Sequence, residues 1–101
     1  MSKKLARMRA FVEANPADPF GWYSLAILQQ ESDPSGALEI FRKVHAEHLD
    51  YLPNYFHFAQ ALVDDAELEE AKKIYEAGIA LAQSTGDAHT LGELQAALEL
   101  L

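Results

Sequence analysis

The stretch that decides the fold is DPFGWYSLA at residues 18–26, where a turn leads into a segment holding the only tryptophan of the chain. Asp18 can accept a hydrogen bond from the free amides of a new helix, and Pro19 suits the first helical position because no donor is needed there. The side chains that follow recur at i, i+3, i+4 and i+7, the spacing of one helix face: Trp22, Leu25, Ala26 and Gln29. We therefore expect a helix from Pro19 to about Gln30 or Glu31, with Trp22 buried against neighbouring helices.

The composition favours one small all-α domain. The chain has 101 residues, of which 50% are hydrophobic, enough for one modest core. It contains no cysteine, which excludes disulfides, thiolate metal sites and cysteine nucleophiles. Its apolar runs are too short to cross a bilayer, and residues 1–10 lack the apolar block of a secretion signal. We expect a cytoplasmic protein.

The formal net charge of −8 is unevenly distributed along the chain. Four of the eight basic residues lie in the first segment (Lys3, Lys4, Arg7 and Arg9), whereas every acidic residue lies at Glu13 or later. An acidic body should repel nucleic acid and anionic lipid, so the sequence predicts neither nucleic-acid nor membrane partners.

Further amphipathic segments lie on both sides of the central stretch. Residues 2–14 place four apolar side chains on one face: Leu5, Met8, Phe11 and Val12. Asp33-Pro34 repeats the start signal of Asp18-Pro19, and a helix face follows at Ala37, Leu38, Phe41, Val44 and His48. A last helix from about Ala88 presents Leu91, Leu94, Leu98 and Leu101. We expect Gly78 and Gly92 to be sites of close helix packing.

The central pattern recurs later in the chain. The spacing of the first stripe is reproduced by Tyr55, Phe58, Ala59 and Leu62, and Ala71, Tyr75 and Gly78 repeat the spacing of Ala37, Phe41 and Val44. Ala37 and Ala71 are 34 residues apart, whereas Trp22 and Tyr55 are 33 apart, which implies a shorter first inter-helix turn.

On these residues the chain resembles the tetratricopeptide-repeat (TPR) family, whose period is about 34 residues, and in particular a small bacterial-type two-repeat protein. The resemblance implies an all-α fold of about six helices, built from antiparallel helix-turn-helix repeats of the α-solenoid type. Residues 1–101 would form a single domain, with a half-repeat helix at 1–15, repeat 1 at 18–50, repeat 2 at 52–83 and a capping helix at 87–101. Two positions depart from the family pattern: Gln29, where a large apolar residue is usual, and Leu49, where proline is usual.

The resemblance also implies a function, because family members are mostly interaction scaffolds that hold a peptide or helix of a partner protein in a concave groove. The first helix of each repeat would line that groove with the stripe rotated about 100° from the buried one. The candidate groove residues are Tyr23, Ile27, Gln30, Phe56, His57, Gln60, Val63, His89 and Glu93. The alternative that Tyr23, Ile27 and Phe56 complete the core stays open. A groove that clamps a C-terminal carboxylate is not expected, because neither helix carries a basic side chain.

Two other functions are compatible with the sequence. The first is weak self-association as a homodimer, because Leu98, Leu100 and Leu101 exceed what one helix face can bury and the basic first segment complements the acidic body. The second, more remote, is a metal site around His45 and His48, with Glu47, Asp50 and His57 nearby in sequence. We predict no catalytic residues, no cofactor and no enzymatic activity, because no phosphate-binding loop, nucleophile elbow or zinc-peptidase helix is present.

Overall fold

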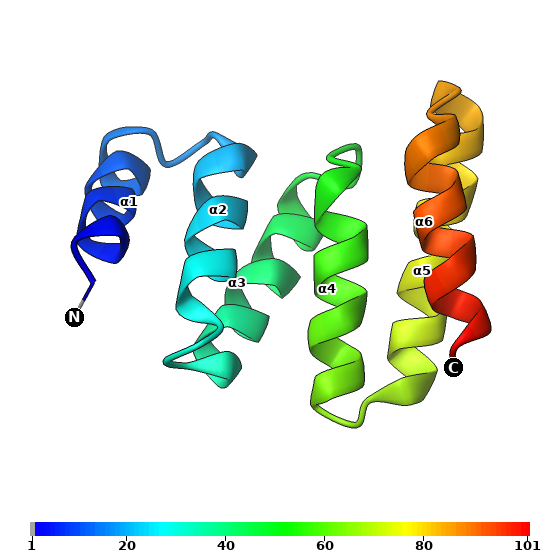
Figure 1. The fold of residues 1–101 in the computed structure, drawn as a ribbon. Helices are drawn as coiled ribbons and strands as arrows, with labels where there is room; N and C mark the ends of the chain where they lie inside the picture. Colours follow the sequence, from blue (N-terminus) through cyan, green and yellow to red (C-terminus); the bar gives the residue numbers. More distant parts are fainter. Residues whose placement is uncertain (1) are drawn as a thin grey trace. The chain divides into compact units, whose positions relative to one another are not determined.

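The computed structural model describes residues 2–101, and within that range the chain forms α-helices joined by short turns, with no strand (Figure 1). The helices are α1 (Lys3–Ala14), α2 (Pro19–Gln29), α3 (Pro34–Glu47), α4 (Pro53–Asp64), α5 (Leu68–Thr85) and α6 (Ala88–Glu99). The predicted all-α class and the number of helices are confirmed. None of these helices is long and apolar enough to cross a membrane.

The helix starts follow the capping signals of the sequence. The side chain of Asp18 accepts a hydrogen bond from the amide of Phe20, and the side chain of Asp33 accepts one from the amide of Gly36. Pro19, Pro34 and Pro53 occupy first-turn positions, where the absence of an N–H costs nothing.

The helices group into two compact units, one ending at Leu49 and the other beginning at Asp50. In unit 1, α1 packs on α2 and α2 packs on α3. In unit 2, α4 packs on α5, α5 packs on α6, and α4 also touches α6. The division lies one residue before the predicted end of repeat 1 at Asp50, so unit 1 holds α1, α2 and α3 and unit 2 holds α4, α5 and α6.

Both units bury most of the predicted helix faces, but of the four leucines predicted for the last helix only Leu94 is buried, and Leu101 lies beyond α6 and is 45% exposed. The buried side chains of unit 1 include Leu5, Val12, Leu25, Ala26, Ala37, Phe41 and Val44. Those of unit 2 include Tyr55, Phe58, Ala59, Leu62, Ala71, Tyr75 and Leu94. The matching positions of the two repeats are thus core positions in both.

Two aromatic residues of unit 1 are less buried than predicted. Trp22 is only half-buried: its Nε1 donates a hydrogen bond of 2.8 Å to the Pro16 carbonyl, and the Lys43 Nζ lies 4.0 Å from the ring centroid. The indole has one polar group, its N–H, and in this arrangement the N–H lies near the surface while the rest of the ring packs against the core. Phe11, expected on the buried face of the first helix, is 39% exposed.

The two predicted close-packing glycines behave differently. A Cβ at Gly78 would lie 2.9 Å from the Tyr55 Cβ and 3.1 Å from the Leu94 Cδ1, so glycine is required for this approach. At Gly92 a Cβ would meet nothing within 4 Å, and the prediction of a close crossing there is wrong. Leu94 and Ala97, rather than Gly92, provide the buried face of α6.

Gln29 shows how unit 1 accepts a polar residue at an apolar position. Its side chain is 6% exposed. Its Oε1 accepts a hydrogen bond of 2.9 Å from Arg9 Nη2, and its Nε2 donates one of 3.1 Å to Asp33 Oδ2. Both ends of the amide are therefore satisfied, which removes most of the cost of burying it.

Candidate functional site

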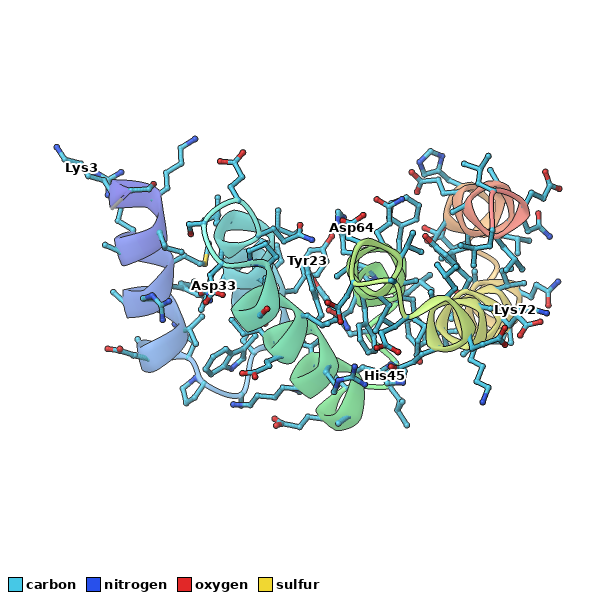
Figure 2. All side chains as sticks on the ribbon, turned by 90° about the horizontal axis from the view of Figure 1, so that it is seen from below. Lys3, Tyr23, Asp33, His45, Asp64 and Lys72 are labelled. Carbon is cyan, nitrogen blue, oxygen red and sulfur yellow. The ribbon has the colours of Figure 1, made fainter. Side chains whose placement is uncertain are left out.

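The candidate residues of unit 1 lie along one side of α2. Tyr23, Ile27 and Gln30 are spaced i, i+4 and i+7 and are all half-buried. Tyr23 projects from the side of α2 away from α1 (Figure 2). The stripe is therefore distinct from Leu25 and Gly21, which pack toward α1.

The candidate residues of α4 form the first part of a surface in unit 2. Phe56, His57 and Val63 are half-buried, and Gln60 is exposed. The Phe56 ring meets the Tyr75 ring edge-on at a centroid distance of 6.4 Å, and the neighbouring His57 ring at 5.6 Å. Phe56 thus rests on the core through Tyr75 while part of its ring stays accessible.

The candidate residues of α6 lie close to those of α4. His89 Nε2 lies 3.5 Å from Glu93 Oε1, one turn further along, and the His89 side chain is 86% exposed. Burial lowers the pKa of His57, and the nearby Glu93 carboxylate opposes this by raising the pKa. The structure therefore brings His57 of α4 and Glu93 of α6 within electrostatic reach of each other.

A pocket of about 150 Å³ extends this surface between the ends of α4 and α6. Its lining comprises Gln60, Val63, Asp64, Tyr75, Ala97, Leu100 and Leu101. Burial is the largest cause of a raised pKa at the Tyr75 hydroxyl. A hydrogen bond with Gln60 lowers this pKa and the Asp64 charge raises it, so that the net shift is upward. We name the surface made by this pocket together with Phe56, His57, His89 and Glu93 the α4–α6 face.

Sequence reasoning found Gln60 and Val63 but missed the other residues of the pocket. The spacing that Tyr75 shares with Phe41 predicts only a core position for it. A fully apolar core position could be filled by phenylalanine. The hydroxyl of Tyr75 is therefore the one feature of the sequence that indicates a polar neighbour at the end of the ring.

A groove in unit 1 was also missed. It has a volume of about 300 Å³ and is lined by Lys4, Arg7, Met8, Phe11 and Leu28. The first four of these residues are spaced i, i+3, i+4 and i+7, so one stripe of α1 supplies most of the lining. The sequence shows this spacing, but the same pattern predicts a buried position for Met8 and Phe11. We call this feature the α1–α2 groove.

Metal chemistry has no support in the geometry. Across residues 2–101, no three histidine, aspartate or glutamate side chains gather closely enough to hold a metal ion. His45, His48 and Asp50 are close in sequence, but their side chains do not form a metal-binding set in the structure.

Comparisons with known proteins agree with the repeat pattern. No family model matches the sequence, and no curated protein matches it. The crystal structure of a tetratricopeptide repeat domain protein from Salinibacter ruber is 32% identical, covers 80% of this chain and 91% of its own, and superposes with a TM-score of 0.75. A solution structure of a tetratricopeptide repeat domain protein from the same organism is 30% identical, with coverages of 83% and 86% and a TM-score of 0.77.

A third solved structure extends the likeness over nearly the whole chain. The solution structure of a protein from Bordetella parapertussis covers 98% of this chain and 87% of its own, with a TM-score of 0.80. At 23% identity it supports the fold alone. With the repeated helix faces and the similarity to the Salinibacter ruber protein, these findings show that the chain belongs to the tetratricopeptide-repeat family.

Proposed function

We propose that the protein is a non-enzymatic binding module, whose α4–α6 face holds a peptide or helix of a partner protein. Tyr23, Ile27 and Gln30 on α2 would provide a second contact stripe. TPR-like folds commonly mediate protein–protein interactions, which supports this class of function. A small-molecule or nucleic-acid ligand has no comparable support.

The observation that carries the proposal is the grouping of the candidate residues in unit 2. Residues of α4 and α6, more than 25 positions apart in the sequence, share one surface with a pocket at its end. That surface has a partly accessible aromatic ring in Phe56, a hydrogen-bonding amide in Gln60 and apolar side chains in Val63 and Leu100. Interfaces that bind peptides combine apolar anchoring sites with surrounding polar groups in this way.

The charge of the α4–α6 face indicates the kind of segment it suits. Asp64 and Glu93 are exposed there, and no lysine or arginine belongs to the face. A partner segment with apolar side chains flanked by lysine or arginine would complement it. We therefore propose a basic amphipathic segment as the ligand.

Site-specific photocrosslinking in extract of the native cells tests the proposal. A photoreactive residue at Gln60 should capture a partner, because this position is exposed at the mouth of the pocket. The matched control is the same residue at Glu76, which is exposed on α5 outside the face. Peptide mapping of the product should find the crosslink in a segment rich in lysine or arginine.

Charge reversal then tests the mode of binding. Glu93→Lys should abolish capture at Gln60, whereas Glu76→Lys should leave it unchanged. Equal capture from Gln60 and Glu76, or capture that survives Glu93→Lys, would show that the α4–α6 face is not the binding site.

A further inference from the structure

The α1–α2 groove of unit 1 has a chemistry opposite to that of the α4–α6 face. Met8, Phe11 and Leu28 form its apolar part, and Phe11 and Leu28 both remain exposed. Lys4 and Arg7, also exposed, flank these side chains, and no acidic residue belongs to the lining. An occupant should therefore combine apolar side chains with carboxylates.

The end of α6 offers that combination in the same chain. Leu100 is 89% exposed, and Leu101 is exposed as well. Glu99 immediately precedes them and is exposed. Residues 74–101 contain no lysine or arginine, so the segment itself carries no basic side chain that would repel Lys4 or Arg7.

We propose that the α1–α2 groove of one copy binds the segment Glu99–Leu101 of a second copy. Leu100 and Leu101 would contact Met8, Phe11 and Leu28, and Glu99 would lie against Lys4 and Arg7. Because the two surfaces differ, the contact is heterologous: each copy uses its groove for one neighbour and its α6 segment for another. The contact is small, so it belongs to the weak, transient class.

This association does not rest on the proposed function, because the groove lies on other helices. The two are nevertheless linked through Leu100 and Leu101, which also line the pocket of the α4–α6 face. A second copy that covers these leucines would compete with a partner for that end of the face.

Sedimentation equilibrium of the intact chain is the first test. The average mass should rise with protein concentration between about 10 µM and about 1 mM, the range expected for a weak transient interface. The rise should shrink at 1 M salt, because charge pairs at an exposed rim are screened. A constant monomer mass over the whole range would overturn the proposal.

Complementary variants test the geometry of the contact. The groove variant, Lys4→Glu with Arg7→Glu, keeps a normal α6 segment. The segment variant, Leu100→Ser with Leu101→Ser, keeps a normal groove. All four positions are exposed, so both variants should keep the helical circular dichroism of the parent chain.

Each variant alone should stay monomeric, whereas an equimolar mixture should form a 1:1 dimer that cannot grow further. This result is expected because only one of the two contacts in the mixture is intact. Lys72→Glu with Lys73→Glu, which makes the same charge change on exposed positions of α5, should associate like the parent chain. Association of either variant by itself, or failure of the mixture to form the dimer, would refute the head-to-tail contact.

Discussion

Repeat 1 (α2 and α3) and repeat 2 (α4 and α5) direct equivalent positions toward the core, but three of these positions hold side chains of different size or polarity. Trp22 in the first corresponds to Tyr55 in the second, Gln29 to Leu62, and Val44 to Gly78. Tyr55 and Leu62 are buried, whereas Trp22 is half-buried and Gln29 is buried with hydrogen bonds to both ends of its amide. The helical spacing thus decides which positions face inward, and the surrounding residues decide what can fill them.

The pairing of Tyr55 with Gly78 explains part of this difference. A Cβ added at Gly78 would lie only 2.9 Å from the Tyr55 Cβ and 3.2 Å from the Tyr55 Cγ, so Tyr55 and the α5 backbone approach closely. In repeat 1 the corresponding position holds the buried Val44. The aromatic residue of that repeat, Trp22, is larger than tyrosine, and its Nε1 donates a hydrogen bond to the Pro16 carbonyl. Each repeat therefore has its own combination of large and small side chains.

The largest expected effect comes from moving the polar residue of repeat 1 into repeat 2. Leu62→Gln would bury an amide where Leu62 is fully buried, without the arginine and aspartate that serve Gln29. We expect the free energy of unfolding to fall by about 3 kcal/mol, because an unsatisfied buried amide loses its hydration and disturbs apolar packing. Urea denaturation followed by circular dichroism measures this loss.

The reciprocal substitution is the control. Gln29→Leu should change the free energy of unfolding by no more than about 1 kcal/mol, because the exposed Arg9 and Asp33 can return to water. If Gln29→Leu costs as much as Leu62→Gln, the hydrogen bonds of Gln29 stabilise unit 1 far more than the local geometry implies.

A second substitution tests the close approach in repeat 2. Gly78→Ala should lower the free energy of unfolding by about 2 kcal/mol, because the added Cβ would press on the Tyr55 Cβ rather than on a flexible chain end. Gly92→Ala is the matched control and should raise it by about 1 kcal/mol, since alanine favours helix and nothing lies near position 92. Similar thermal shifts in the two variants would contradict the assignment of Gly78 as a close-packing position.

Much of this fold could be predicted because its determinants are local in the sequence. Asp18-Pro19 and Asp33-Pro34 give helix starts, and the 3.6-residue spacing gives the buried faces. The two glycines show where this reasoning fails. Gly78 and Gly92 carry the same local signal, yet only Gly78 faces another helix closely, because that depends on the tertiary neighbours Tyr55 and Leu94.

The candidate site was less predictable for the same reason. Rotating the buried stripe by 100° identified Gln60 and Val63, because both lie on one helix. It could not identify Tyr75 or Leu100, because these reach the pocket from α5 and from the end of α6. The α1–α2 groove was missed because an amphipathic stripe such as Met8 and Phe11 does not show how much of itself the neighbouring helix covers.

A smaller effect is expected in the turn that makes repeat 2 one residue longer. Ala66 has a φ of 61°, the left-handed region, and the Glu67 amide donates to the Leu62 carbonyl across it. Ala66→Gly should raise the free energy of unfolding by about 0.5–1 kcal/mol, because glycine reaches this conformation without the Cβ clash. Ala77→Gly, at an exposed position inside α5, should instead lower it by about 1 kcal/mol. A loss of stability in both variants would argue against strain at Ala66.

The smallest expected effect is a pH dependence from His57, a residue specific to unit 2. Burial holds the folded-state pKa of His57 below the usual 6.5, so the unfolded chain binds more protons and stability falls as the pH drops below about 6.5. Urea midpoints at pH 7.5 and 5.5 should differ less in His57→Gln than in the parent chain. Glu93→Gln should enlarge the difference, because the Glu93 charge raises the pKa of His57. If Glu93→Gln has no effect while His57→Gln removes the pH dependence, burial alone sets the pKa, and α4 and α6 are not electrostatically coupled at this face.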